Sequence, residues 1–173
     1  MIREPIGQTV AVSIAPLEPR HWDRVRDIYL EGLGTGQASF ETGPPEWTEW
    51  DQAHLPRLRF VALHGGEVVG WVALCPVSRR QCYAGVAEVS IYVADTVRGR
   101  GIGRLLLEEL VLASERAGVW TLQAAIFPEN LQSLRLHERC GFRVVGRRVR
   151  IAQRDGVWRD TLLLERRSAI VGV

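Results

Sequence analysis

Apolar residues recur along this chain at two spacings, one typical of helices and the other of strands. Between residues 19 and 33 they stand three or four positions apart, which predicts a helix that ends in the glycine-rich segment 32–36. The same spacing over residues 103–117, followed by Gly118, predicts a second helix. Shorter helices are predicted at 46–55, after a loop over 37–45, and at 130–139.

Strands are predicted where apolar runs are short or alternate with polar residues. The first covers residues 10–14 and ends at Pro16, and a hairpin joins 59–63 to 67–74 across Gly65 and Gly66. Residues 88–93 alternate, and 119–126 form an apolar strand. A last hairpin joins 142–151 to 157–164 across 154–156. The order β-α-α-β-β-β-α-β-α-β-β predicts an α/β fold with one mixed sheet in a single domain.

Length and composition agree with one folded domain. The chain has 173 residues, of which 46% are hydrophobic and 24% charged, the balance of a soluble globular protein. We expect the domain to cover residues 10–167, between an N-terminal tail, 1–9, and a C-terminal tail, 168–173. No apolar run approaches the roughly 18 residues that span a bilayer, and the N-terminus lacks the apolar core of a secretory signal. We therefore expect a cytoplasmic protein without a membrane partner.

The basic residues exclude two classes of enzyme. All 22 are arginine, so the chain offers neither the lysine amine of a Schiff-base enzyme nor the lysine of a P-loop nucleotide site. With 20 acidic residues the formal net charge is only +2, which argues against nucleic acid as a partner. Cys75, Cys82 and Cys140 are odd in number and lack C-x-x-C spacing, so we expect reduced thiols and no metal site.

The clearest chemical signal is a glycine-rich turn, Arg98-Gly99-Arg100-Gly101-Ile102-Gly103, between a predicted strand and a predicted helix. Glycines let the backbone turn tightly and present N–H groups to an anion, and the positive end of the helix dipole suits a pyrophosphate. Arg104 occupies the position of the last glycine of a G-x-G-x-x-G motif, so a dinucleotide fold is excluded. The turn predicts either phosphate binding or a plain structural connection.

Several segments, in order, resemble one enzyme family. The turn at 98–103 is similar to the acetyl-CoA pyrophosphate loop of the GNAT superfamily of N-acetyltransferases. Further segments narrow the resemblance to the phosphinothricin (methionine sulfoximine) N-acetyltransferases, over about residues 12 to 166; they are 40–45, 65–74, 88–93, 130–142 and 154–160. The resemblance implies a mostly antiparallel sheet flanked by helices, acetyl-CoA as co-substrate and no metal. It also implies direct transfer of the acetyl group to the amine of a small amino-acid-like acceptor.

Two residues match catalytic positions of that family. Glu88 matches the glutamate used as general base, which has to remove a proton because the amine is an ammonium at neutral pH. His137 lies where most of the superfamily has a tyrosine that protonates the departing CoA thiolate, and the resemblance implies the same role. A lone histidine on a helix is more often a packing residue, and water is an alternative acid, so both alternatives to His137 stay open at this point.

The resemblance also implies binding residues. A strand backbone would pair with the pantetheine amides, the arginine- and glycine-rich turn would hold the pyrophosphate, and an asparagine would hold the pantetheine arm. Asn130 would equally suit the N-cap of the helix that follows it. The residues expected to bind acetyl-CoA are Ile91, Tyr92, Val93, Arg98, Gly99, Arg100, Gly101, Ile102, Gly103, Arg104, Asn130 and Ser133. Those expected to bind the acceptor are Phe40, Thr42, Arg80 and Tyr83, with the arginine gripping a substrate carboxylate.

Other functions stay open. The chain departs from the family pattern at Ser78, Val86, Ala87 and Val89, so the sequence leaves the physiological acceptor, phosphinothricin included, unidentified. Acetylation of a peptide or protein N-terminus and acyl-CoA binding without catalysis are the alternatives. Nucleic-acid binding through the arginines of 143–150 is disfavoured, because valines interleave with them as in a half-buried strand. As partners we expect a small-molecule amine and a second copy of the chain.

Overall fold

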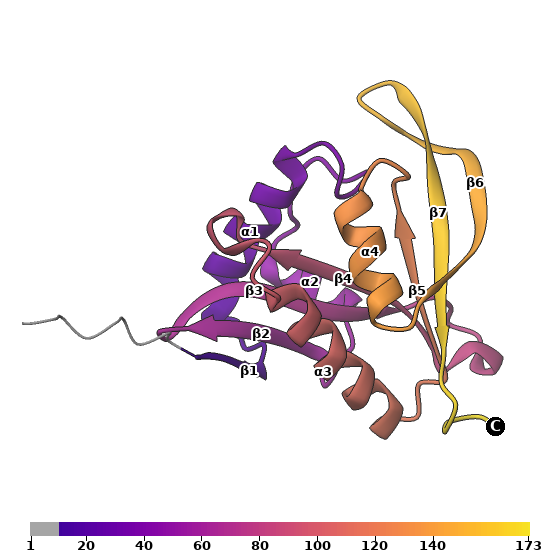
Figure 1. Ribbon diagram of the computed structural model, residues 1–173, viewed down its shortest axis with the longest axis horizontal. Coiled ribbons are helices and arrows are strands. Elements are labelled where there is room, and N and C mark those ends of the chain that lie inside the picture. Colours follow the sequence, from indigo (N-terminus) through magenta and orange to yellow (C-terminus); the bar gives the residue numbers. More distant parts are fainter. Residues whose placement is uncertain (1–10) are drawn as a thin grey trace, which may run out of the picture.

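Seven strands form one sheet in the order β1-β2-β3-β4-β5-β7-β6 in the computed structural model, which describes residues 11–173 (Figure 1). All neighbouring strands are antiparallel except β4 and β5. The strands are β1 (Val12–Pro16), β2 (Arg59–His64), β3 (Glu67–Pro76), β4 (Val86–Val93), β5 (Thr121–Ile126), β6 (Arg143–Arg154) and β7 (Val157–Arg167). The predicted mixed, mostly antiparallel sheet is confirmed.

Four α-helices flank the sheet within residues 11–173. They are α1 (Trp22–Gly34), α2 (Trp47–Ala53), α3 (Ile102–Arg116) and α4 (Leu131–Arg139). Short 3₁₀ turns precede α1, β4 and α3, at Pro19–His21, Gln81–Tyr83 and Asp95–Val97. Each predicted helix is present, with ends that differ by three residues or fewer. None of the helices in the described part of the chain is long and apolar enough to cross a membrane.

α1 and α3 pack on opposite faces of the sheet. Trp71 of β3 contacts Tyr29 of α1, with ring centres 5.5 Å apart. Gly70, the preceding residue, approaches α3 so closely that an added Cβ would lie 3.1 Å from Leu106. Successive strand residues point to opposite faces, so the two helices sandwich β3. α2 lies on the α1 face, where Trp50 packs against Trp71 with ring centres 5.7 Å apart.

β4 and β5 are paired only where they begin. Residues 86–88 of β4 lie opposite residues 121–123 of β5. Beyond Glu88, β4 continues to Val93 alongside β3 alone, and β5 continues to Ile126 alongside β7 alone. The two strands therefore diverge in the middle of the sheet, and the backbone groups that face the opening have no partner strand within residues 11–173.

β6 and β7 form a long ribbon. Only residues 162–167 of β7 pair with β5, so the rest of the ribbon extends beyond the sheet (Figure 1). The register of β6 is interrupted by a bulge in which Arg150 has a left-handed φ of 49°. Asp160 of β7 holds this bulge, because it accepts the backbone N–H of Arg150 at 2.8 Å and the Nε–H of Arg147 at 2.6 Å.

The first strand differs most from its prediction. The sequence predicts that Pro16 ends it, whereas β1 includes Pro16, which is paired with Phe60. Among residues 11–173, β1 is an edge strand with a neighbour on one side only, and there a residue without an N–H is tolerated. Val10, where the prediction begins, and the predicted tail 1–9 lie outside the described residues.

Other strand ends shift by a few residues. β4 begins two residues earlier than predicted and β5 two residues later, at Thr121. β6 and β7 each extend three residues beyond their predicted ends, because β6 stays paired with β7, and β7 with β5, past the apolar pattern. Residues 168–173 contain no helix or strand, but Ser168 is buried and its hydroxyl donates to Glu115 of α3 at 2.9 Å.

Candidate active site

A cavity of about 1030 Å³ occupies the opening between β4 and β5. It is bounded by the connection from α1 to α2, by the glycine-rich turn before α3, and by α4. Most of the residues expected to bind acetyl-CoA or to catalyse transfer line it: Glu88, Ile91, Tyr92, Val93, Arg98, Gly99, Gly101, Ile102, Gly103, Arg104, Asn130, Ser133 and His137. Of the expected acceptor residues, Phe40 does so, and its ring packs edge-on against Phe127 at 4.9 Å.

Four of the expected site residues do not line this cavity. Arg100 is exposed in the glycine-rich turn, and Thr42 is exposed in the connection to α2. Arg80 and Tyr83 lie together on the connection from β3 to β4, where the guanidinium stands 5.6 Å from the centre of the Tyr83 ring and both side chains are exposed. The structure therefore groups the donor-side residues and Phe40, and leaves Arg80 and Tyr83 outside.

Glu88 stands at the point where β4 and β5 separate. It belongs to the last paired position of the two strands, opposite Gln123, whose Nε2 donates to Glu88 Oε2 at 2.7 Å. This hydrogen bond orients one carboxylate oxygen and leaves the other free. Cys75 of β3 is paired with Glu88 on the other side, and burial, with a smaller contribution from the Glu88 charge, raises the pKa of its thiol to about 11. Cys75 is therefore a neutral neighbour of the carboxylate.

The glycine-rich turn has the geometry of an anion site as well as of a connection. Gly99 and Gly101 have φ values of 77° and 82°, which side chains rarely adopt, and Gly101 is the N-cap of α3. The first N–H groups of a helix have no partner within it, so those of α3 face the cavity mouth with the positive end of the dipole. Arg98 and Arg104 line the same mouth, although each already forms an ion pair, with Asp95 at 2.6 Å and Glu108 at 2.7 Å respectively.

Asn130 fixes the start of α4. Its Oδ1 accepts the backbone N–H of Ser133 at 3.1 Å, as the N-cap interpretation predicts. Its Nδ2 donates to the carbonyl of Gln37 at 3.2 Å, so the same side chain ties α4 to the connection between α1 and α2. Both contacts hold Asn130 at the edge of the cavity.

His137 is almost fully buried, at 2% exposure. Its Nδ1 lies 2.8 Å from the carbonyl oxygen of Ser133, which can only accept, so Nδ1 carries the proton. Nε2 is buried and has no hydrogen-bond partner among residues 11–173. Burial lowers the pKa of the ring below 6.5, and the Ser133 carbonyl only partly opposes this. The ring is therefore neutral at neutral pH and has a lone pair, not a proton, on Nε2.

Sequence reasoning missed Tyr29 in the cavity wall, and it named Tyr92, the residue beside it, only as one of those expected to bind acetyl-CoA. Tyr29 of α1 and Tyr92 of β4 have ring centres 4.7 Å apart, and both line the cavity. Burial is the main cause that raises the pKa of each hydroxyl, so both are protonated at neutral pH. Tyr29 appears in the sequence only as one apolar position of a helix, and no local pattern distinguishes it from the core.

The β6–β7 ribbon contacts the connection between α1 and α2, whose residues 35–40 border the cavity and are called its roof below. Arg154 donates to the carbonyls of Leu33 and Ser39, and Arg159 donates to the carbonyl of Gly36. Arg159 also pairs with Glu129 at 3.1 Å. The three contacts with carbonyls join positions more than 100 residues apart in the chain and fix the connection that covers the opening. The matching segment 154–160 is the only signal in the sequence that could have pointed to them.

No group of three or more histidine, cysteine, aspartate or glutamate side chains with metal-binding geometry occurs within the part of the chain that the structure describes. The positive charge of the arginines of 143–150, which the sequence raised as a nucleic-acid site, is partly neutralised by ion pairs. Arg143 lies 3.6 Å from Glu165 and Arg147 lies 2.6 Å from Asp160.

Comparison with known proteins agrees with the geometry. The model of the acetyltransferase (GNAT) family matches residues 22–142. A phosphinothricin N-acetyltransferase of Alcaligenes faecalis is 35% identical over 148 residues, which cover 80% of this chain and 74% of the relative. An L-methionine sulfoximine/L-methionine sulfone acetyltransferase of Pseudomonas aeruginosa is 33% identical over 100 residues, 58% of each protein.

A solved structure has the same architecture. The crystal structure of a GNAT superfamily phosphinothricin acetyltransferase from Sinorhizobium meliloti, in complex with AcCoA, superposes with a TM-score of 0.83 at 27% identity. The match covers 93% of this chain and 90% of that one. Together with the sequence relatives, it confirms the resemblance drawn from the sequence segments and the fold that the resemblance implies.

Proposed function

This chain belongs to the acetyltransferase (GNAT) family and is an acyltransferase, and we propose that it transfers the acetyl group of acetyl-CoA directly to the amine of a small amino-acid-like acceptor, with Glu88 as general base. The observation that carries the proposal is the position of Glu88 at the apex of the opening between β4 and β5. The cavity that begins there ends at the N-terminus of α3, and would thus join the proposed base to the proposed pyrophosphate site.

Acetyl-CoA fits the cavity as an added strand. In the described part of the chain, the β4 backbone over 91–93 has no neighbouring strand on the β5 side, so its N–H and C=O groups can pair with the pantetheine amides. The pyrophosphate would lie on the N–H groups of the turn at 99–103, with Arg98 and Arg104 beside it. The thioester carbonyl would then lie near the N–H of a β4 residue, which would stabilise the oxyanion of the tetrahedral intermediate.

Glu88 would remove the proton that prevents the acceptor nitrogen from attacking. An amine is protonated at neutral pH, and general-base catalysis contributes roughly 10² to 10⁴ to the rate. Gln123 holds Oε2 of Glu88 at 2.7 Å, which leaves Oε1 for the acceptor or for a water between them. The nitrogen then forms its bond to the acetyl carbon, and the bond from that carbon to the CoA sulfur breaks.

We propose that water, rather than His137, protonates the departing thiolate. A neutral imidazole whose only proton is held by the Ser133 carbonyl has none to give from Nε2. A thiol has a pKa of about 8.5, so its anion is a moderate leaving group that solvent in an open cavity can protonate. His137 would then stabilise the packing of α4, through its hydrogen bond to the Ser133 carbonyl and an edge-on contact with Phe142, with ring centres 5.0 Å apart.

The acceptor side favours a small molecule. The connection over 35–40 covers the cavity and is fixed by Arg154 and Arg159, and Phe40 forms part of its wall. A peptide N-terminus would need a more open groove. Arg80 and Tyr83 lie outside the cavity, so a carboxylate of the acceptor would reach Arg80 only at the exposed surface, where we keep it as a proposed contact.

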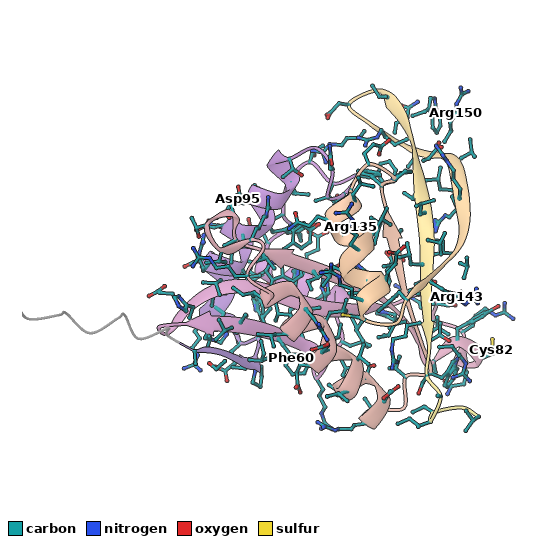
Figure 2. The ribbon with its side chains drawn as sticks, in the orientation of Figure 1. Phe60, Cys82, Asp95, Arg135, Arg143 and Arg150 are labelled. Atoms are coloured by element: carbon teal, nitrogen blue, oxygen red, sulfur yellow. The ribbon has the colours of Figure 1, made fainter. Side chains whose placement is uncertain are left out.

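We also propose that two copies of the chain associate through the ribbon. Several of its large apolar side chains are exposed: Val144, Val149, Ile151, Val157 and Trp158. Figure 2 shows Arg143 and Arg150 on this ribbon, away from Arg135 of α4, which lines the cavity. A mass measured by light scattering should correspond to a dimer, and Val149→Asp should yield a monomer. An unchanged mass in that variant would place the interface elsewhere.

Thiol release from acetyl-CoA tests the proposed function. The panel of acceptors comprises common amino acids, methionine sulfone, methionine sulfoximine, phosphinothricin, polyamines and short peptides. We expect release of CoA thiol with at least one small amine, matched by an equal amount of acetylated product in mass spectrometry. Release only with peptides would favour N-terminal acetylation. Binding of acetyl-CoA without release on any amine would favour a protein that only binds acyl-CoA.

A further inference from the structure

Four arginines line the cavity, and they differ in whether a carboxylate already pairs with them. Arg98 and Arg104 come from the glycine-rich turn and the first turn of α3, and each forms an ion pair. Arg135 and Arg139 come from α4, on which Figure 2 labels Arg135, and neither forms an ion pair within residues 11–173. The α4 wall of the cavity therefore carries two positive charges without a carboxylate partner in the described chain.

α4 packs directly on the glycine-rich turn. A Cβ added to Gly103 would lie 3.1 Å from a methyl carbon of Leu136, so the helix and the turn are in contact there. Arg135 precedes Leu136 and Arg139 follows it by three positions, and all three residues line the cavity. Side chains three and four positions apart on a helix are neighbours. The two guanidinium groups therefore lie along the wall next to the turn that would bind the pyrophosphate.

Acetyl-CoA needs a second anion site close to that turn. Besides the pyrophosphate it carries a phosphate on the 3′ oxygen of its ribose, and the pyrophosphate is attached to the 5′ carbon of the same ribose. A pyrophosphate on the N–H groups of the turn therefore places the 3′-phosphate no further away than the width of one sugar. A phosphate monoester is mostly a dianion at neutral pH, and arginine binds phosphate through paired, charge-assisted hydrogen bonds.

We propose that Arg135 and Arg139 bind the 3′-phosphate of the donor, so that the chain selects CoA thioesters over donors that lack this phosphate. This rests on the proposed function and names the part of the co-substrate that α4 recognises. The charge of the cavity wall agrees with it. The acidic residues among the described lining are Glu88, at the apex of the opening, and Glu129, which is paired with Arg159. Neither adds an unpaired negative charge next to the two arginines of α4.

Calorimetric titration with CoA and with 3′-dephospho-CoA tests the site, because the two ligands differ only in that phosphate. We expect the wild type to bind CoA about tenfold more tightly, the effect of one or two charge-assisted hydrogen bonds. Arg135→Gln and Arg139→Gln should each reduce this preference severalfold, and the double variant should abolish it. The matched control is Arg116→Gln: like Arg139, Arg116 is an exposed arginine in the last turn of a helix, but it does not line the cavity. It should keep the wild-type preference.

The outcomes separate this inference from the function on which it rests. Equal affinity of the wild type for CoA and dephospho-CoA overturns the 3′-phosphate site and leaves the acetyltransferase intact. A preference that survives the double variant overturns it too, because other groups then hold the phosphate, or the two arginines act on the part that both ligands share. Binding of neither ligand by the wild type overturns the proposed function itself and this inference with it.

Discussion

Replacement of Gly101 by alanine separates the two interpretations of the glycine-rich turn, because the chain provides a matched control. Gly101 precedes α3 and Gly118 follows it; both have φ of 82°, and in both cases an added Cβ would meet no atom within 4 Å. Only Gly101 lines the cavity. The two variants therefore carry the same backbone strain, and only one of them places a methyl group where acetyl-CoA is proposed to bind.

The strain sets the expected loss of stability. An L-residue in the left-handed region costs about 1–2 kcal/mol, and for a chain of this length each kcal/mol lowers Tm by roughly 2–4 °C. Gly101→Ala and Gly118→Ala should therefore each lower Tm by about 2–8 °C. The methyl group of Gly101→Ala should also keep the pyrophosphate from the backbone N–H groups and raise the Kd for acetyl-CoA tenfold or more, about 1.4 kcal/mol.

Thermal unfolding and isothermal titration calorimetry measure the two effects on the same samples. We expect a lower Tm in both variants and a weaker affinity for acetyl-CoA in Gly101→Ala alone. Equal losses of Tm with wild-type affinity in both would refute the reasoning and leave the turn as a structural connection.

Three further changes test other parts of the account. His137→Gln should weaken the pH dependence of the free energy of unfolding below pH 6.5, measured by urea unfolding. The pKa of the wild-type ring is lowered in the folded protein, so the stability that the neutral ring contributes is present above pH 6.5 and is lost as the pH falls below it. A steeper loss of stability with falling pH in the variant would contradict a neutral ring. Arg154→Ala should release the cavity roof and raise the acceptor KM severalfold; unchanged kinetics would show that the roof is fixed without it. Gly85→Ala should lower Tm more than Gly118→Ala, because its Cβ would lie 2.0 Å from the Trp120 ring; an equal Tm would mean that the indole moves aside at no cost.

Local chemistry explains what the sequence predicted well. The glycines of the turn, the long amphipathic pattern of α3 and the asparagine before α4 each determine structure within a few residues, and the structure has the expected element at each place. The segment 88–93 identifies Glu88 as a candidate, and the structure places it where β4 and β5 separate. Its role as base stays a prediction, and so do the roles of the other site residues.

Long-range packing explains what the sequence could not predict. The contacts of Arg154 and Arg159 join the ribbon to the end of α1, and no local pattern indicates which carbonyls an arginine will reach. The same holds for Gln123 beside Glu88, and for the depth at which His137 is buried, which determines the charge of its ring. The exposed position of Arg80 depends on the path of a loop, and a sequence segment alone does not determine that path.

The pH dependence of kcat in Glu88→Gln tests the central claim most directly. The glutamine keeps the shape of the side chain but cannot accept a proton, while a free amine needs no base. With saturating acetyl-CoA and the best acceptor of the panel, we predict a kcat about 10² or more below that of the wild type near pH 7. The difference should narrow as the pH approaches the pKa of the amine, with the Kd for acetyl-CoA unchanged throughout. A kcat equal to that of the wild type at every pH would contradict the account and remove Glu88 as the base.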